Sequence, residues 1–130
     1  MYERTTNGIR ILVEPYFLDD QSDPDEDHYV WAYTVRIENG TGGTIHLRSR
    51  HWVITDGLGQ TEEVRGEGVV GEQPEIRPGE GFEYTSGAPL ATPSGVMVGR
   101  YGMETADGQP FEVDIPAFSL DSPHERRQIH

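Results

Sequence analysis

The sequence predicts an all-β domain, an antiparallel β-sandwich of about seven or eight strands with a fibronectin type III or immunoglobulin-like architecture. Glycine and proline contribute 16 and 9 of the 130 residues and separate short apolar runs. Within these runs apolar and polar side chains alternate, which is typical of strands joined by turns. No apolar pattern with a helical period extends over a useful length. Strands at this spacing favour a sandwich over a parallel sheet.

The first predicted strand covers Gly8–Leu18 and carries apolar side chains on one side. Pro15 interrupts it, and because proline has no backbone N–H to donate to a ladder, we expect an edge strand or a bulge there. The segment Asp19–Asp27 follows, with six acidic side chains in nine residues. Repulsion between like charges at this density favours an exposed loop.

The strongest strand pattern lies in His28–Asn39. One parity holds the apolar residues, which are Tyr29, Trp31, Tyr33, Val35 and Ile37. This alternation predicts the inner face of the sandwich. Asn39-Gly40-Thr41 matches a glycosylation sequon, but the glycines of Gly40–Gly43 make a hairpin turn the preferred interpretation.

Thr44–Asp56 is expected to return from that turn as the next strand. Its alternation changes phase, since Leu47 lies at an odd apolar position and Trp52 at an even one. A β-bulge near Ser49–His51 would restore a continuous apolar face. The alternative is that the odd parity continues and turns His51 inward.

Further short strands are predicted after the turn at Asp56–Gly59. They cover Thr61–Arg65, Gly81–Gly87, Gly95–Thr105 and the alternating run Phe111–Ala117, with a long irregular stretch over Gly66–Gly81. We expect one domain over residues 1–123 and a flexible polar tail over 124–130.

Composition excludes several classes of function. The net charge is −13, cysteine is absent, and all ten basic residues are arginine. Thiolate chemistry and lysine Schiff bases are therefore excluded, and repulsion of phosphate backbones argues against nucleic-acid binding. No apolar run is long enough to span a membrane and the start shows no signal-peptide pattern, so a cytoplasmic location is expected.

The segment Gly66–Gly71 reads GEGVVG and matches the GxGxxG pattern of phosphate-binding loops. Pro74 and Pro78 follow closely and prevent a helix from starting after it, which excludes a Rossmann site. Two interpretations remain: an anion-binding nest at Gly66, Gly68 and Gly71, or a glycine loop that crosses the end of a sandwich.

Three basic residues near this motif are candidate phosphate or carboxylate ligands: Arg50, His51 and Arg65. The alternative is that each of them pairs with one of the many acidic side chains. The expected ligand is a pyrophosphate or a nucleotide, and binding would be weak because of the net charge.

No metal site or catalytic constellation is predicted. Asp23–Asp27 resembles the start of a calcium loop, but His28 and Thr34 stand where that loop needs glycine and glutamate. The five histidines have no HxH or HxxxH spacing. We therefore expect no catalytic residues and no cofactor, with weak Mg²⁺ or Co²⁺ association as the remaining metal chemistry.

Six collinear strings resemble the bacterial ApaG family and cover nearly the whole chain, among them SRHWVITD and EVRGEGVVGEQP. They occupy Ser49–Asp56, Glu63–Pro74, Pro78–Glu80, Phe82–Gly87, Pro93–Tyr101 and Ile115–Asp121. The acidic segment and the residues after Pro123 are the least similar to the family.

This resemblance implies a fibronectin type III-like sandwich and a loosely defined function. The family carries a label that links it to cobalt resistance and magnesium efflux, and its glycine motif has been discussed as a phosphate site. Related domains in larger proteins look like protein-interaction modules. The expected function is a non-catalytic module that binds a protein partner, and the alternative is weak phosphate or pyrophosphate binding at Gly66–Gly71. Whether the chain is a monomer or a homodimer stays open.

Overall fold

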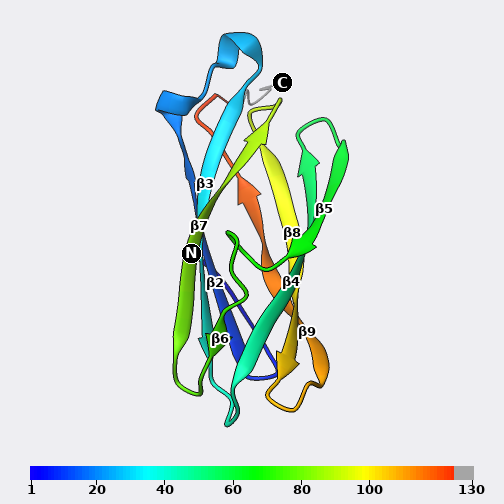
Figure 1. Cartoon of the computed structure of the whole chain (residues 1–130). Helices are drawn as coiled ribbons and strands as arrows, with labels where there is room; N and C mark the ends of the chain where they lie inside the picture. The colour runs from blue at the N-terminus through cyan, green and yellow to red at the C-terminus, as the bar shows by residue number, and fades with distance from the viewer. Residues whose placement is uncertain (125–130) are drawn as a thin grey trace.

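The computed structural model describes residues 1–124, which form two antiparallel sheets packed face to face (Figure 1). Within these residues the strands are β1 (Tyr2–Thr6), β2 (Ile9–Phe17), β3 (Tyr29–Asn39), β4 (Ile45–Asp56), β5 (Thr61–Glu67), β6 (Glu75–Ile76), β7 (Gly81–Leu90), β8 (Gly95–Thr105) and β9 (Pro110–Leu120). The predicted all-β sandwich is confirmed. Of these strands, β1 and β6 were not predicted.

One sheet has the order β1-β2-β3-β7, and the other has the order β5-β4-β8-β9 with β6 beside β4. The expectation that β4 returns along β3 is therefore wrong: the chain crosses to the other sheet between them. Asn39, only 1% exposed, fixes this crossing, since its Nδ2 donates to the carbonyls of Gly43 and Ile76, both at 2.9 Å. The sequon asparagine thus has a structural role inside the turn.

The aromatic face of β3 lies in the core, as predicted. Tyr29, Trp31, Tyr33, Val35 and Ile37 are all buried. Trp31 also ties the two sheets together, because its Nε1 donates to the carbonyl of Asp121 just after β9, at 2.7 Å. The alternation in the sequence therefore identified the inner face of the first sheet.

The predicted bulge in β4 is present, and the register against β8 shifts between Leu47 and Ser49. The extra residue is Arg48, slightly earlier than expected. Beyond it, the even positions face the core, as buried Trp52 shows. The alternative with an inward His51 is wrong.

Pro15 lies where the sequence required an unpaired edge. Its neighbour on one side is Tyr33 of β3. On the other side the pairing of β1 ends at Val13, so no strand needs an N–H from Pro15.

The acidic segment between β2 and β3 contains two short 3-10 turns, η1 (Asp19–Gln21) and η2 (Pro24–Glu26). All six of its carboxylates are exposed, as charge repulsion predicted. Of the predicted tail 124–130, only His124 belongs to the described residues. No helix in the described part of the chain is long and apolar enough to cross a membrane.

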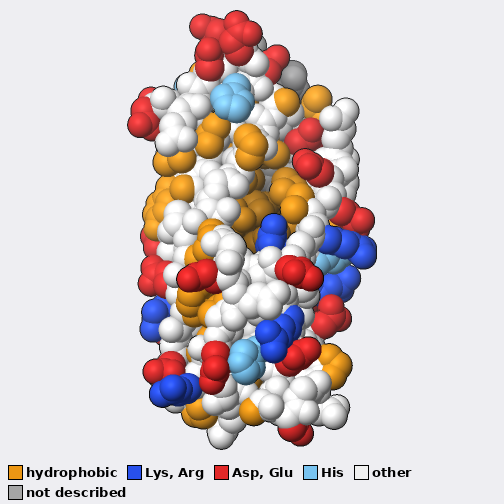
Figure 2. All heavy atoms as spheres, viewed as in Figure 1, with side chains coloured by type: hydrophobic (Ala, Val, Ile, Leu, Met, Phe, Trp, Pro, Cys, Tyr) orange, Lys and Arg blue, Asp and Glu red, His pale blue; other side chains and the backbone are white. Residues whose placement is uncertain are grey.

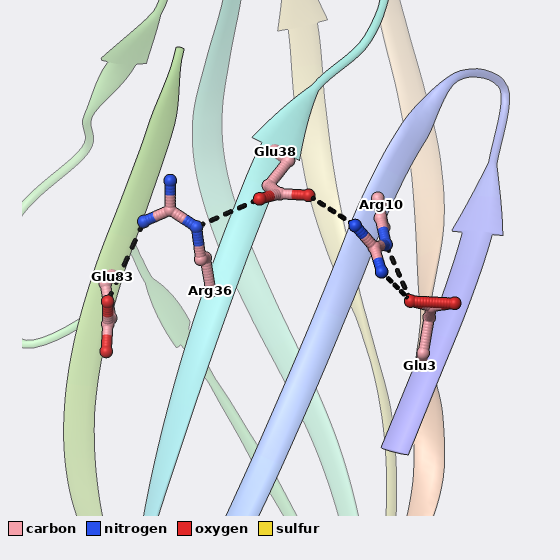
Figure 3. Close-up of polar contacts among 5 residues, drawn as sticks. All are labelled: Glu3, Arg10, Arg36, Glu38 and Glu83. Atoms are coloured by element: carbon pink, nitrogen blue, oxygen red, sulfur yellow. Dashed lines mark hydrogen bonds and ion pairs between the residues drawn. The ribbon is translucent and has the colours of Figure 1, made fainter. Parts of the chain in front are cut away.

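The outer face of the first sheet carries a row of paired charges from four strands (Figure 3). Arg10 on β2 contacts Glu3 on β1 and donates to Glu38 on β3 at 3.1 Å. Arg36 donates to Glu38 at 3.0 Å and lies 3.7 Å from Glu83 on β7. The row links every strand of this sheet across its exposed surface.

Candidate functional site

The two long sides of the sandwich differ in how they are closed. On one side β1 bridges to β9, because the Tyr2 hydroxyl lies 2.9 Å from Oγ of Ser119 and Arg4 pairs with Asp114 at 3.0 Å. On the other side the edge strands are β5 and β7, which do not pair with each other. Figure 2 shows a hollow lined by hydrophobic side chains on this side, with one basic side chain at its lower rim. We call this region the open side.

The glycine motif forms a tight hairpin at the open side. Val70 and Gly71 both have positive φ, 44° and 79°. The flanking residues exchange backbone hydrogen bonds: the N–H of Val69 donates to Glu72 at 2.8 Å, and that of Glu72 donates to Val69 at 2.9 Å. This is the pattern of a two-residue turn with two left-handed positions.

Val69 enters the core from this hairpin. Its side chain is 1% exposed and belongs to the main hydrophobic cluster. Gly68, with φ of 65°, turns the chain inward just before it. A β-carbon at Gly68 would lie 2.2 Å from the carbonyl oxygen of Glu72, so only glycine fits there. In Figure 1 the segment after β5 crosses between β7 and β4, where it closes the lower part of the open side.

Two central backbone N–H groups of the motif are engaged within the protein. The N–H of Gly68 donates to the carbonyl of Arg48 at 2.8 Å, and that of Val69 is used in the hairpin. The carbonyls of Glu67 and Gly68 both point at Arg50, whose Nη1 donates to them at 3.0 and 2.9 Å. The loop thus offers carbonyl oxygens to a cation, the opposite of what an anion nest offers.

Arg50 is the basic residue that the register of β4 places on the inner side of its sheet. It pairs with Gly66 on β5 and with buried Tyr101 on β8. Within residues 1–124, no carboxylate lies within 4 Å of its guanidinium, whereas Arg48, Arg65 and Arg100 all have carboxylate neighbours. An arginine without a carboxylate neighbour among the described residues is notable in a chain of net charge −13.

Three buried tyrosines surround Arg50. Burial raises the pKa of Tyr33, Tyr84 and Tyr101 above the ordinary 10, and the positive charge of Arg50 acts in the opposite direction on the pKa of each. The hydroxyls of Tyr84 and Tyr101 form a hydrogen bond across the two sheets. These tyrosines are therefore neutral at physiological pH and leave the charge of Arg50 uncompensated.

Trp52 adds a second polar group without a partner. Its side chain is 98% buried, and its Nε1 makes no hydrogen bond within the described residues. The benzo-ring atom Cε3 faces Gly99 of β8, where an added β-carbon would lie 2.6 Å from it. Nε1 is on the opposite edge of the indole, away from this contact with β8.

The remaining candidate residues lie on the outer face of the second sheet. His51 and Arg65 face each other across β4 and β5, and Arg100 of β8 stands beside them, with its Nη2 3.3 Å from Nδ1 of His51. These three residues line a shallow cavity of about 250 Å³ together with Ser49, Arg50, Gly66 and Glu112. Glu63 and Glu112 partly neutralise it, at 3.9 Å from Arg65 and 3.4 Å from Arg100.

The structure keeps part of the group that the sequence predicted, since Arg50, His51, Arg65 and Gly66 all line the outer cavity. The guanidinium of Arg50 meets Gly66 and Gly68 at the open side, whereas the side chains of His51 and Arg65 project from the outer face, and Gly71 lies in the hairpin turn. Sequence reasoning missed Trp52 and Tyr84 as site residues. The sequence pattern could have predicted that Arg50 faces inward, because Arg50 shares the even parity of Trp52 after the bulge.

Fold and site together define a small antiparallel β-sandwich domain with one open side, where Arg50 has no carboxylate neighbour and Trp52 has no hydrogen-bond partner among the described residues. Among residues 1–124 no group of His, Cys, Asp and Glu side chains could hold a metal ion. The family model described as the ApaG domain matches residues 19–105. The chain belongs to the ApaG family.

Relatives from several bacteria support this assignment. Protein ApaG of Parvibaculum lavamentivorans is 65% identical over 130 residues, and that of Paramagnetospirillum magneticum is 58% identical; both matches cover all of each chain. The crystal structure of a Bordetella pertussis protein described as ApaA is 50% identical, with a TM-score of 0.86, and covers 90% of this chain and 95% of that one. These names state no reaction and no ligand.

Proposed function

We propose that this chain is a non-catalytic binding module that holds a protein partner on its open side, between β5 and β7. The observation that carries this proposal is the asymmetry of the sandwich. One side is closed by contacts from β1, and on the other side no element of residues 1–124 covers the apolar side chains and the edges of β5 and β7 above the hairpin at Val69–Glu72.

The side chains at the open side suit a protein partner. Seven hydrophobic residues pack against the core while staying partly exposed, and four of them belong to β4, β5 and β7; these four are Ile54, Val64, Phe82 and Leu90. Partly exposed apolar side chains beside a hollow are typical of interaction sites.

The strand edges offer backbone hydrogen bonds as well. β7 is an edge strand of ten residues, and the alternate N–H and C=O groups that face away from β3 are available to an added strand. An extended segment that pairs with such an edge gains main-chain hydrogen bonds, while pockets beside the edge select its side chains.

Site-specific photo-crosslinking tests this proposal. A photoreactive residue at Glu62, which is exposed on β5 at the rim of the open side, is expected to give defined adducts with a partner protein in cells. The matched control is Glu14, an exposed glutamate on the outer face of β2. Adducts at Glu62 that disappear in a folded Val64→Asp variant support the proposal. Equal adducts at both positions would contradict it.

A second candidate function is weak binding of phosphate or pyrophosphate, and the outer cavity beside His51, Arg65 and Arg100 favours it. Arginine and histidine donors around a small cavity suit an oxyanion, and added Mg²⁺ would offset the negative charge of the protein. Titration with pyrophosphate, with and without Mg²⁺, is expected to shift the backbone amides of His51 and Arg65. Arg65→Ala should reduce these shifts, and amides that do not move at millimolar ligand would exclude the candidate.

A further inference from the structure

We propose that the open side binds the C-terminal end of an extended peptide segment of the partner, with Arg50 as the residue that receives the terminal carboxylate. This inference rests on the proposed function and names the chemistry that the partner presents. Four features of the open side lead to it.

The first feature is the unused capacity of Arg50. Its Nη1 holds the carbonyls of Glu67 and Gly68, and within the described residues Nε and Nη2 make no hydrogen bond. Its guanidinium lies against Gly66, where a β-carbon would be 2.8 Å from Cζ, so the glycine leaves room for the group in this position. A guanidinium that is fixed on one side and free on the other suits a carboxylate, which arginine binds in a planar geometry.

The second feature is the Nε1 of Trp52, which is buried and has no hydrogen-bond partner within the described residues. A buried N–H that lacks an acceptor is unfavourable, so the site gains when a ligand supplies one. Trp52 lies two residues after Arg50 on the same strand and faces the same side. Because Nε1 is fully covered in the unbound protein, a carboxylate or the last peptide carbonyl of a bound segment would reach it only once the side chains around it move aside.

The third feature is the closed lower end of the hollow. The hairpin at Val69–Glu72 and the buried side chain of Val69 block the open side below Arg50. Arg50 is bonded to the carbonyls of Glu67 and Gly68 just before this hairpin, so a segment that enters beside Leu90 and Val64 would reach Arg50 where the hairpin crosses its path. This favours a chain end over an internal aspartate or glutamate, which would need space for the chain to continue.

The fourth feature is the apolar lining above Arg50. Ile54, Val64 and Leu90 are partly exposed and pack against the core from three strands. They suit an apolar side chain in the last residues of the segment, while the edges of β5 and β7 favour an extended backbone. The partner segment is therefore extended, apolar near its end, and terminated by a free carboxylate.

The experiment compares two pools of short peptides on the full-length chain. Both pools end in Leu, Ile, Val or Phe; one carries free C-terminal carboxylates and the other C-terminal amides. The indole N–H signals of the protein's two tryptophans are followed by NMR. The free-acid pool is expected to shift the Trp52 signal and leave that of Trp31, which is bonded to Asp121, in place.

Variants separate the role of Arg50 from that of nearby charges. Arg50→Gln is expected to weaken binding of the free-acid pool about tenfold or more, as the loss of a charge-assisted hydrogen bond would. Arg50→Lys should give an intermediate affinity, because it keeps the charge and loses the planar donor group. Arg65→Gln, on the outer face, is the matched control and should bind as the unchanged protein does.

Equal binding of acid and amide pools to the unchanged protein would overturn the carboxylate assignment, whether or not the Arg50 variants fold. If Arg65→Gln lost as much affinity for the free-acid pool as Arg50→Gln, the assignment of Arg50 would be overturned too. The crosslinks at Glu62 test the proposed function separately: if they form while neither pool binds, this inference fails and the proposed function stands.

Discussion

The guanidinium of Arg50 lies directly over the Cα atom of Gly66, so closely that a β-carbon would be 2.8 Å from Cζ, Nη1 and Nη2 alike. This contact gives the first glycine of the motif a role that no phosphate is needed to explain. Gly68 has a different role, since its neighbour is the backbone carbonyl of Glu72. The two glycines should therefore respond differently to substitution.

Gly68→Ala is expected to destabilise the fold by about 3 kcal/mol, because a left-handed alanine is strained and its β-carbon would displace the backbone of Glu72. Gly66→Ala should cost about 1 kcal/mol or less, since a flexible arginine end can move away. Urea unfolding of both variants checks this. Similar costs would show that the hairpin is not held as described.

Val70→Gly should stabilise the protein. Val70 is 55% exposed and has φ of 44°, a conformation that strains a β-branched residue. Glycine relieves this strain but also gives the unfolded chain more conformational freedom, which offsets part of the benefit. The free energy of unfolding should therefore rise by about 0.5–1 kcal/mol. Val96→Gly is the control, because Val96 is an exposed valine within β8 and its replacement should lower stability. A loss in both variants would contradict the strained turn.

Asn39→Ala is expected to lower the free energy of unfolding by about 3 kcal/mol. The amide donates to two carbonyls, and its Oδ1 accepts from the N–H and the hydroxyl of Thr41 at 2.9 and 2.6 Å. Removing it leaves buried polar groups without partners. Thr41→Val removes one of these bonds and should cost about 1 kcal/mol. Thermal and urea unfolding distinguish the two, and equal costs would argue against a buried amide network.

Stability should fall as the pH rises above 10. The raised pKa values of Tyr84 and Tyr101 mean that the unfolded chain ionises these hydroxyls first. Their contribution is complete below the unfolded value of 10 and is lost as the pH rises toward the folded values. Tyrosinate absorbance should show these groups ionising together with unfolding. In a variant with phenylalanine at both positions, alkaline unfolding should be less steep; an unchanged pH dependence would contradict the assignment.

The row of charges in Figure 3 predicts a small effect in acid. The hydrogen bond from Arg36 is the main cause that holds the pKa of Glu38 below its ordinary 4.5, with Arg10 as a further cause. The Glu38 carboxylate therefore stabilises the fold above pH 4.5, and this contribution is lost as the pH falls through its lowered pKa in the folded protein. Glu38→Gln should therefore be less stable than the unchanged protein at neutral pH and equal to it in strong acid. High salt should reduce the difference, because the pairs are exposed.

Local patterns predicted much of the fold, and their limits are physical. The alternation in β3 identified its buried face, since one side of the strand meets only the core. β1 escaped prediction because its residues are mostly polar and half exposed. The pairing of β3 with β4 was wrong because a turn sequence does not encode which sheet the chain enters next.

The candidate site was harder to predict for a related reason. Arg50 and His51 are neighbours in sequence, and strand geometry sends their side chains to opposite faces. The bulge at Arg48 decides which of the two points inward. Without the bulge the odd parity of Leu47 would continue and the two side chains would exchange faces, so the composition of the site depends on a backbone detail.

The contacts of β1 make one long side of the sandwich behave as a hinge. Tyr2, Arg4 and Thr6 each contact β9, the last through its hydroxyl and the N–H of Asp114 at 3.4 Å. Opening fluctuations should therefore separate the two sheets at β5 and β7, while the side held by β1 and β9 stays together. Amide hydrogens of β5 should exchange with solvent faster than those of β2 and β8. A ligand that bridges β5 and β7 would keep the two sheets together and slow amide hydrogen exchange throughout both of them.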